Sequence, residues 1–339
     1  MRRPGIVIGE FELIDLIVAE LGEQAQGARV GLGPGDDAAL LALPDGEQLA
    51  MSVDTLLPDV HFPTRGHPEL VGYRALAVSA SDLAAMGADP LGALVALVLP
   101  ADRSLDWVRG LARGMARASA AFKLPIVGGN LARGGCSVSV SVQGSVPAAD
   151  ALVRSGAQPG DGVWVSGQFG GAALALEGYE AGPRDMGAGG ADTRTVAQPA
   201  HPLEIAVPEH LTAAMRRYYC PQPRLPLGRH LRGRASAAID VSDGLVADLG
   251  HLCRASGVGV ELWAAALPNF PGASIEQVLF GGDDYELCFC APANAIAPQF
   301  AEEWQLTQIG RVVAAGEPSG GISLDGVSLS TKGFDHFAE

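Results

Sequence analysis

Residues 32–42 read LGPGDDAALLA, so two adjacent carboxylates stand between a glycine-rich turn and an apolar run that indicates a buried strand. A second stretch of this kind, GGDDYELCF, occupies residues 281–289. Carboxylates near a protein core are costly unless they are paired with a positive charge or bound to a metal. The first question that the sequence raises is therefore what compensates these charges.

The composition is that of a folded protein with a strong excess of acidic residues. The chain has 339 residues, enough for two domains, with 48% hydrophobic and 18% charged residues. Its net charge is −15, and only Lys123 and Lys332 are lysines. No run of basic residues exists, which argues against nucleic acid as a partner. The longest apolar stretch, residues 91–100, is about half of the ~20 residues that a membrane span requires, so no membrane partner is expected.

The cysteines and the N-terminus indicate a cytoplasmic protein. The five cysteines are odd in number and show no CxxC spacing, so we expect reduced thiols. The opening MRRPGIVIGE lacks an apolar run of signal-peptide length. Histidines at zinc-site spacing, a P-loop, a G-x-G-x-x-G turn and a G-x-S-x-G elbow are also missing from the sequence, which argues against those chemistries.

Periodicity predicts an α/β (α+β) fold in two domains. Helical spacing covers residues 10–21, 67–88 and 104–122, and LGALVALVL at 91–99 reads as a strand. Residues 124–129 are expected to be a short strand that enters a glycine turn. The texture changes near residue 147, which predicts domains 1–147 and 148–339. Within the second domain, the Gly/Ala/Pro-rich residues 181–202 are expected to form a loop or an insertion.

Residues 136–146, CSVSVSVQGSV, alternate cleanly and predict a strand with two different faces. Cys136 and the three valines are expected to face the core. Ser137, Ser139, Ser141 and Gln143 are expected to face outward or toward a partner. The aromatic C-terminal stretch KGFDHF, which is unusual for a frayed end, is expected to be docked.

The aspartates carry the chemical signal, since each stands among apolar neighbours at a turn, a strand or a helix. They are Asp36, Asp37, Asp54, Asp82, Asp240, Asp243, Asp283 and Asp284. With few basic residues nearby, hard divalent cations are the natural compensating charge, and oxygen-only ligands suit Mg²⁺. Taken singly, Asp36 or Asp243 could instead cap a turn or a helix, and His61 could be a packed loop histidine. Taken together, the clusters favour a metal-dependent site.

The motifs resemble those of bacterial thiamine-monophosphate kinases over nearly the whole chain. GDDAALL, SVDTLLPDVHF, SDLAAMGADP, the Gly-Gly pair at 128–129, RSGAQPGD, DVSDGLVADLGHL, GGDDYELCF and GFDHF occur in the family's order. The resemblance implies ATP-dependent phosphorylation of thiamine monophosphate to thiamine diphosphate, with several Mg²⁺ ions as cofactor. It also implies a synthetase-like fold and a homodimer: an N-terminal mixed sheet with helices on one face forms a dimer barrel, and a C-terminal α/β domain completes the nucleotide cleft.

The resemblance also assigns roles to individual positions. It implies metal ligation by Asp37, Ser52, Val53, Asp54, Asp82, Asn130, Asp240 and Asp243. It implies ATP contacts from Gly129, Asn130, Arg154 and Ser242, with the turn at 128–130 passing the phosphates. It implies substrate contacts from His61, Asp283 and Phe334. GGDDYELCF is therefore expected to be a substrate-side wall, and Asp36 to orient its turn while Asp37 holds metal.

Three positions depart from the family pattern. Asn130 replaces a metal-binding carboxylate, Val53 replaces a common Thr and could ligate only through its carbonyl, and Asp283 is one methylene shorter than the usual Glu. Two alternatives to this function are another ATP-using synthetase of the same superfamily and an inactive divalent-ion-binding homologue. The acceptor would be an anionic phosphate oxygen, so no catalytic base is expected. Metal and electrostatic catalysis would drive a direct, in-line transfer without a phosphoenzyme.

Overall fold

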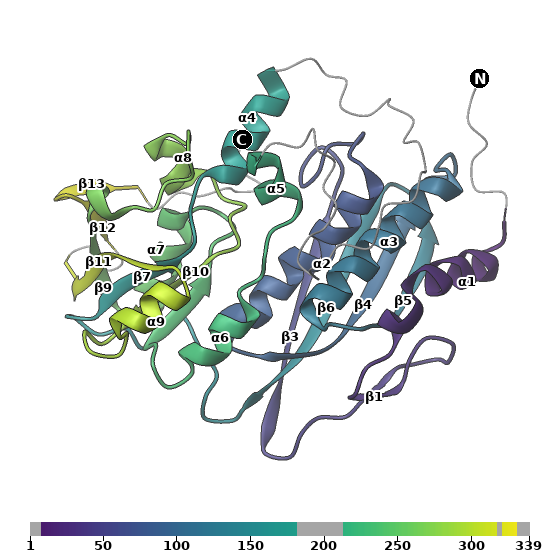
Figure 1. Ribbon diagram of the computed structural model, residues 1–339, viewed down its shortest axis with the longest axis horizontal. Helices are drawn as coiled ribbons and strands as arrows, with labels where there is room; N and C mark the ends of the chain where they lie inside the picture. The colour runs from purple at the N-terminus through teal and green to yellow at the C-terminus, as the bar shows by residue number, and fades with distance from the viewer. Residues whose placement is uncertain (1–7, 182–212, 317–320, 331–339) are drawn as a thin grey trace. The chain divides into compact units, whose positions relative to one another are not determined.

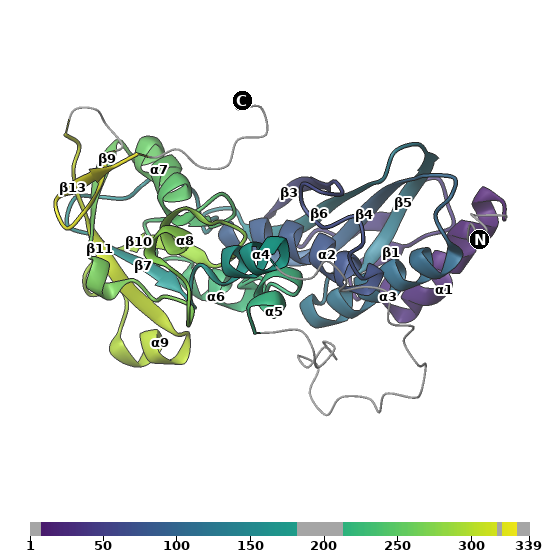
Figure 2. The same ribbon diagram turned by 90° about the horizontal axis from the view of Figure 1, so that it is seen from above.

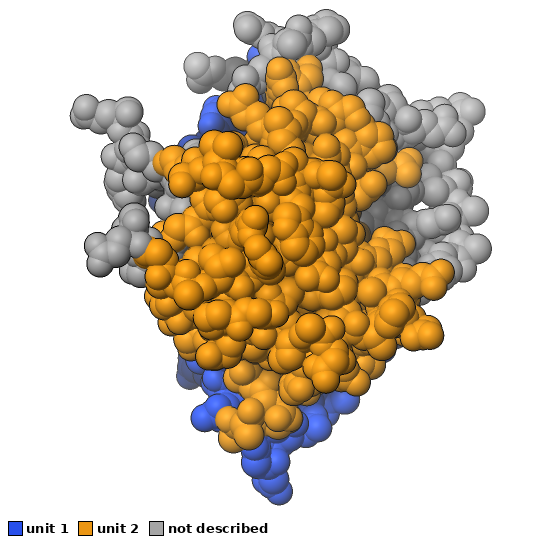
Figure 3. All heavy atoms as spheres, turned by 90° about the vertical axis from the view of Figure 1, so that its left-hand side faces the viewer, with its two compact units in different colours: residues 1–80, 90–145, 182–211 blue, residues 81–89, 146–181, 212–339 orange. Residues whose placement is uncertain are grey.

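The computed structural model describes residues 8–181, 213–316 and 321–330 (Figure 1). Its chain divides into two compact units, shown in different colours in Figure 3. Unit 1 comprises residues 1–80, 90–145 and 182–211, and unit 2 comprises residues 81–89, 146–181 and 212–339. In the described part of the chain, no helix is both long and apolar enough to span a membrane.

Unit 1 is built on a four-stranded sheet in the order β3-β6-β4-β5. Its strands are β3 (Glu47–Leu56), β4 (Asp89–Leu99), β5 (Ile126–Arg133) and β6 (Ser137–Pro147). Helices α1 (Glu10–Leu21), α2 (Pro68–Ala85) and α3 (Leu105–Phe122) lie on one side of this sheet (Figure 2). A short 3₁₀ turn, η1 (Gly22–Ala25), follows α1, and the two-stranded ribbon of β1 (Val30–Leu32) and β2 (Leu40–Leu41) precedes the sheet.

The two faces of the unit 1 sheet differ in exposure. On the side of the helices, Val138, Val140 and Val142 of β6 are fully buried, as their alternation predicts. On the opposite side, Met51 and Val53 of β3 are 64% and 63% exposed, and Leu94 of β4 is 40% exposed. Among the described residues, no layer covers this face, which carries apolar side chains on β3 and β4 and serine side chains on β6 between them.

Unit 2 contains a seven-stranded mixed sheet in the order β13-β12-β9-β11-β7-β10-β8. Its strands are β7 (Gly162–Ser166), β8 (Ala237–Asp240), β9 (Val258–Leu262), β10 (Leu287–Ala291), β11 (Leu306–Ala314), β12 (Ile322–Leu324) and β13 (Val327–Leu329). The pairing of β12 with β9 is parallel, while β10 pairs antiparallel with both β7 and β8. Strand β10 in the interior of the sheet and strand β8 at its edge are buried along their whole length, and the sequence of β10, LCFCA, is accordingly apolar throughout.

Helices pack around this sheet and complete the core of unit 2. They are α4 (Gly171–Ala181), α5 (Ala213–Tyr219), α6 (Leu225–Leu231), α7 (Leu245–Ser256), α8 (Ile275–Phe280) and α9 (Pro298–Glu303), with a 3₁₀ turn η2 (Ala264–Ala266). Leu245, Leu249 and Leu252 of α7 join Val163 and Val165 of β7 in one fully buried cluster. The predicted α/β (α+β) class is confirmed by both units.

Most predicted elements are found close to their expected bounds. The helix expected at 10–21 is α1, and the helix expected at 104–122 is α3, which begins after Ser104 because the Ser104 Oγ accepts a hydrogen bond from Trp107 N at 3.2 Å. Residues 181–202 and the KGFDHF stretch fall, apart from Ala181, outside the described residues.

Two details of unit 1 were predicted wrongly. The glycine turn expected at 128–130 is part of β5, which continues to Arg133. Gly129 pairs with Val95 of β4 so closely that any Cβ would overlap the Val95 carbonyl oxygen, so the glycine serves strand pairing rather than turning. Gln143, expected to face outward or toward a partner, is buried within the chain: its Nε2 donates to Ser141 Oγ at 2.9 Å, and the alternation of β6 ends there.

Candidate active site

Two loops of unit 2 that carry predicted site residues lie side by side. Residues 241–244 follow β8, and residues 281–286 precede β10. Asp283 N donates to the Ser242 carbonyl at 2.8 Å, and Tyr285 N donates to the Val241 carbonyl at 2.8 Å. Gly282, at φ +66°, makes this approach possible, since a Cβ there would lie 2.6 Å from the Ser242 carbonyl oxygen. The structure thus brings the predicted nucleotide residue Ser242 next to the predicted substrate residue Asp283.

The carboxylate of Asp248 holds the first of these loops. Its Oδ2 accepts hydrogen bonds from Ser242 N and Asp243 N, both at 2.9 Å. The alternative that Asp243 caps helix α7 is wrong, because Gly244 occupies the N-cap position and Asp248 satisfies the loop amides from the first turn. Burial, and secondarily the charge of Asp243, raise the pKa of Asp248 to about 7, although Arg154 and the two amides oppose the shift.

Arg154 lies beside β8, and Asp240 lies on it. Ala238 N of β8 donates to the Val153 carbonyl at 2.9 Å, which places Arg154 beside the strand. Asp240 ends β8, is almost fully buried, and pairs with Leu287. The pKa of His251 on α7 is lowered by burial and by Arg254 and Arg154, against the charge of Asp243. The predicted residues Arg154, Asp240 and Asp243 are therefore grouped in unit 2.

The second loop is fixed from its inner side by Asp284 and Glu286. Asp284 accepts hydrogen bonds from Gly170 N at 3.0 and 3.2 Å. Burial is the main cause that raises the pKa of Asp284, to about 8. Glu286 accepts hydrogen bonds from Ser166 Oγ at 2.6 Å and, through ion pairs of 2.5 to 2.7 Å, from Arg217 and Arg224. Burial would raise the pKa of Glu286, but the two arginines and Ser166 hold it below its usual range.

Asp284 predicts a specific dependence of stability on pH. The pKa of Asp284 is about 8 in the folded chain and about 4 in the unfolded chain, so between these pH values only the folded state keeps the proton. The free energy of unfolding therefore falls as pH rises through this range, and it levels off above pH 8. Asp284→Asn removes this titration and keeps an acceptor for Gly170 N. We expect the stability of the wild type relative to the variant to fall by about 2–3 kcal/mol between pH 5 and 7.

Denaturant unfolding at several pH values measures this difference. Asp150→Asn, at an exposed position of the same unit, is the control and should follow the wild type throughout. Parallel stability curves for wild type and Asp284→Asn would contradict a proton held at Asp284.

The predicted residues of unit 1 lie on or near its sheet. Ser52 and Asp54 are half-buried on the helix-covered side of β3, whereas the Val53 side chain lies on the open face, so at position 53 only the main chain could serve a metal. Asp37 is exposed after its turn, and its N donates to Asp36 Oδ1 at 2.8 Å, so Asp36 orients the turn. Asn130 is exposed on β5.

His61 is held by hydrogen bonds to its neighbours, and Asp82 lies on a helix. His61 Nδ1 accepts a hydrogen bond from Leu57 N at 3.0 Å, and its carbonyl accepts one from Arg74 Nε at 3.1 Å. Asp82 lies half-buried near the end of α2, in the part of the chain that clusters with unit 2. Phe334 lies outside the described residues.

The residues fit Mg²⁺ by chemistry, although they do not form a complete site by themselves. Every predicted donor is a carboxylate, hydroxyl, amide or main-chain oxygen, the ligand type that Mg²⁺ prefers. Within residues 8–181, 213–316 and 321–330, no three His, Cys, Asp or Glu side chains form a group that could hold a metal ion. The predicted donors are divided between the two units, with Asp37 and Asp54 in unit 1 and Asp240 and Asp243 in unit 2.

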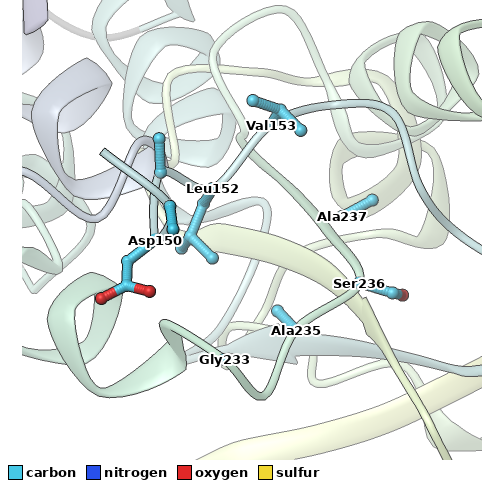
Figure 4. Close-up of a pocket in the computed structure, with 9 residues that line it drawn as sticks. Asp150, Leu152, Val153, Gly233, Ala235, Ser236 and Ala237 are labelled. Atoms are coloured by element: carbon cyan, nitrogen blue, oxygen red, sulfur yellow. The ribbon is translucent and has the colours of Figure 1, made fainter. Parts of the chain in front are cut away.

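Two cavities of unit 2 lie outside these loops. The first, of about 170 Å³, is lined by residues 149–153, 233 and 235–237 (Figure 4). It is smaller than the ~300–1,000 Å³ typical of small-molecule sites, so it is not a nucleotide site. The second, of about 610 Å³, is lined by Arg217 and Arg224 with Gln168, Glu302 and Gln305 among others. There Glu286 already neutralises one of the two guanidinium charges.

Sequence reasoning missed three residues that build the site: Asp248, Tyr285 and Glu286. Asp248 follows Asp243 at a spacing of five, and an acidic residue in the first turn of a helix was the available signal. Tyr285 and Glu286 stand inside the quoted motif GGDDYELCF. The partners of Glu286 are distant in the chain, so no local pattern could assign them.

Comparisons with known proteins identify the class of fold. A family model described as AIR synthase related protein, N-terminal domain, matches residues 35–146, and the corresponding C-terminal domain model matches residues 158–323. The structure of hydrogenase maturation protein HypE in complex with ATP has a TM-score of 0.71 at 17% identity, which shows a shared fold. The chain therefore has the two-domain fold of the AIR synthase-related proteins.

Similarity over the full length identifies the family within this class. Thiamine-monophosphate kinase of Escherichia coli strain K12 is 37% identical over 348 residues, covering 97% of this chain and 98% of the relative. The structure of thiamine-monophosphate kinase from Stenotrophomonas maltophilia K279a is 37% identical with a TM-score of 0.78, covering 95% of this chain and 98% of that chain. The structure of AaThiL complexed with AMPPCP and TMP is 32% identical with a TM-score of 0.71, covering 97% of both chains. The chain belongs to the thiamine-monophosphate kinase family, whose members are phosphotransferases.

Proposed function

We propose that this chain transfers the terminal phosphoryl group of ATP to thiamine monophosphate and releases thiamine diphosphate and ADP. The observation that carries the proposal is the hydrogen-bonded pairing of residues 241–244 with residues 281–286. This pairing places the expected nucleotide and metal residues Ser242 and Asp243 beside the expected substrate residue Asp283. The names of the relatives, and the complex of AaThiL with AMPPCP and TMP, support the same two substrates.

In this reaction the chain must bring two anions, ATP and thiamine monophosphate, together; it does not have to activate a nucleophile. The acceptor oxygen belongs to a phosphate that is already anionic near neutral pH, so no general base is required. Arg154 supplies positive charge beside β8, and Ser242 supplies a hydroxyl in the loop that Asp248 fixes. Positioning and electrostatic stabilisation then account for the rate of a direct transfer. Labelled phosphate trapped on the protein after exposure to ATP would contradict a direct transfer.

The proposed cofactor is Mg²⁺, and oxygen donors for it are proposed in each unit. Asp240 and Asp243 are the proposed ligands in unit 2, together with Asp82. The proposed ligands in unit 1 are Asp37, Ser52, the Val53 carbonyl, Asp54 and Asn130. When bound, Mg²⁺ neutralises phosphate charge and aligns the reacting groups for in-line displacement. Gly129 and Asn130 on β5 are proposed ATP contacts, and His61 and Phe334 are proposed substrate contacts.

The proposed assembly is a homodimer formed through unit 1. The open face of its sheet exposes Leu49, Met51 and Val53 of β3 and Leu94 of β4. Strand β6 lies between β3 and β4 and presents Ser139, which is hydrogen-bonded to Thr55, so this surface combines apolar side chains with hydroxyl groups. Exposed apolar side chains of this kind are typical of an interaction site, and a second copy of the sheet offers a matching surface. Sedimentation at micromolar concentration should give twice the chain mass of 34.8 kDa. A particle of single-chain mass would contradict the dimer.

We propose a cytoplasmic location, which the absence of a disulfide among the five cysteines supports. The domain roles are proposed likewise: residues 1–147 for dimerisation and for part of the ATP and metal site, and residues 148–339 to complete the nucleotide and substrate cleft.

A single assay tests the proposed function. The purified chain is incubated with ATP and MgCl₂, with and without thiamine monophosphate, and both ADP and thiamine diphosphate are quantified. We expect equal amounts of the two products, formed only when thiamine monophosphate and Mg²⁺ are present. ADP release without thiamine diphosphate would favour another ATP-using enzyme of the superfamily. No product under any condition would favour an inactive divalent-ion-binding homologue, the alternative that Asn130 suggests.

A further inference from the structure

The loop of residues 281–286 has an unusual backbone. Gly282, Asp283 and Tyr285 have φ values of +66°, +59° and +50°, in the left-handed region. Glycine adopts this conformation freely and Asp tolerates it, but for a bulky residue such as Tyr it is energetically unfavourable. Left-handed non-glycine residues persist only where the surrounding structure holds them, and they cluster at functional sites.

The surrounding contacts are sufficient to hold this loop. Asp284 accepts hydrogen bonds from Gly170 N, and the Glu286 side chain is 2% exposed and bound by Arg217, Arg224 and Ser166. On the other edge, the main-chain N–H groups of Asp283 and Tyr285 donate to residues 242 and 241. The left-handed conformation of Tyr285 is thus fixed on both sides of the residue.

In this loop, successive side chains from residue 283 to residue 286 alternate between partly buried and buried positions. Asp284 and Glu286 are buried, whereas Asp283 and Tyr285 are half-buried. The Tyr285 hydroxyl donates a hydrogen bond to Asp283 Oδ1 at 3.1 Å. A hydrogen bond to a carboxylate restricts its orientation, and Asp283 has only two side-chain torsions to restrict.

We propose that Tyr285 is a positioning residue, whose hydroxyl sets the orientation in which the Asp283 carboxylate meets thiamine monophosphate. The proposal rests on the proposed function, because it assigns Asp283 to the substrate side of the site. Tyr285 acts through Asp283 and not on the nucleotide. Loss of its hydroxyl therefore weakens binding of thiamine monophosphate and leaves the use of ATP unchanged.

Tyr285→Phe tests this role, because it removes one oxygen and keeps the ring. We expect the KM for thiamine monophosphate to rise about fivefold, as for loss of one hydrogen bond, with the KM for ATP unchanged and kcat within twofold. The melting temperature should stay within about 2 °C of the wild type. A uniform loss of activity together with a lowered melting temperature would indicate a structural role and overturn the proposal.

A double-mutant cycle with Asp283→Gly separates positioning from direct contact. Glycine removes the carboxylate and adopts the positive φ at position 283 without strain. If Tyr285 acts through Asp283, Tyr285→Phe has no further effect on the KM for thiamine monophosphate in the Asp283→Gly background. An equal fivefold effect in both backgrounds would overturn the proposal. Failure of the proposed function is distinguishable, because the wild type itself would then form no thiamine diphosphate.

Discussion

Glu286→Ala is expected to destabilise unit 2 by about 3–5 kcal/mol, because it leaves two guanidinium groups without their shared carboxylate. The Glu286 side chain is 2% exposed, and those of Arg217 and Arg224 are 25% and 26% exposed. Arg224 binds side-on, with Nε to Oε2 and Nη2 to Oε1, while Arg217 Nη2 binds Oε1. Since its pKa is held below the usual range, Glu286 is ionised at neutral pH and the variant removes a charge that is present.

Denaturant unfolding followed by tryptophan fluorescence measures this loss. The matched control is Glu261→Ala, which breaks the ion pair with Arg311 in the same unit. That pair is exposed, with side chains 31% and 59% accessible, so the control should lose less than about 1 kcal/mol. Glu286→Gln keeps the shape and one acceptor, and should fall between the two. Equal small losses for Glu286→Ala and Glu261→Ala would contradict a stabilising role for the buried cluster.

Features that depend on neighbouring residues could be predicted from the sequence, whereas the contacts of Glu286 could not. Helix α1 (Glu10–Leu21) matches the predicted bounds, and α3 (Leu105–Phe122) begins within one residue of them, because helical periodicity is a local signal. The valines of β6 are buried as their alternation predicts. Glu286 lies 62 and 69 residues from its two arginines, and no periodicity reports a contact at that separation.

The errors have the same physical origin. The pair Gly128–Gly129 carries the same local signal whether it turns the chain or allows two strands to approach, and only the position of Val95 decides between them. Asp243 carries a capping signal, but the loop amides are satisfied by Asp248 from inside the helix. The aspartate pattern predicted which residue types gather near the site, whereas the network that orients them depends on the tertiary structure.

Asp243→Asn is expected to reduce kcat for thiamine diphosphate formation by about 100-fold or more, which corresponds to about 2.7 kcal/mol of lost transition-state stabilisation. Asp243 is half-buried next to Ser242, in the loop that pairs with Asp283. The change keeps the side-chain shape and the main-chain hydrogen bond to Asp248, but it removes a negative charge from the proposed metal ligands. Activity and the rise in melting temperature on addition of MgCl₂ and ATP are measured together.

These two measurements give different results for a metal ligand and for a loop residue. If Asp243 is a metal ligand, Asp243→Asn needs a higher Mg²⁺ concentration for half-maximal rate and shows a smaller rise in melting temperature with MgCl₂ and ATP than the wild type. If Asp243 only supports the loop, Asp243→Asn has a lower melting temperature without MgCl₂ and an unchanged Mg²⁺ requirement. Asp106→Asn, whose carboxylate is 93% exposed on α3, is the control and should change neither quantity. Retention of full activity by Asp243→Asn would move the metal site away from this loop. The other proposed carboxylate ligands, Asp37, Asp54, Asp82 and Asp240, would then have to hold the Mg²⁺ that neutralises the phosphates.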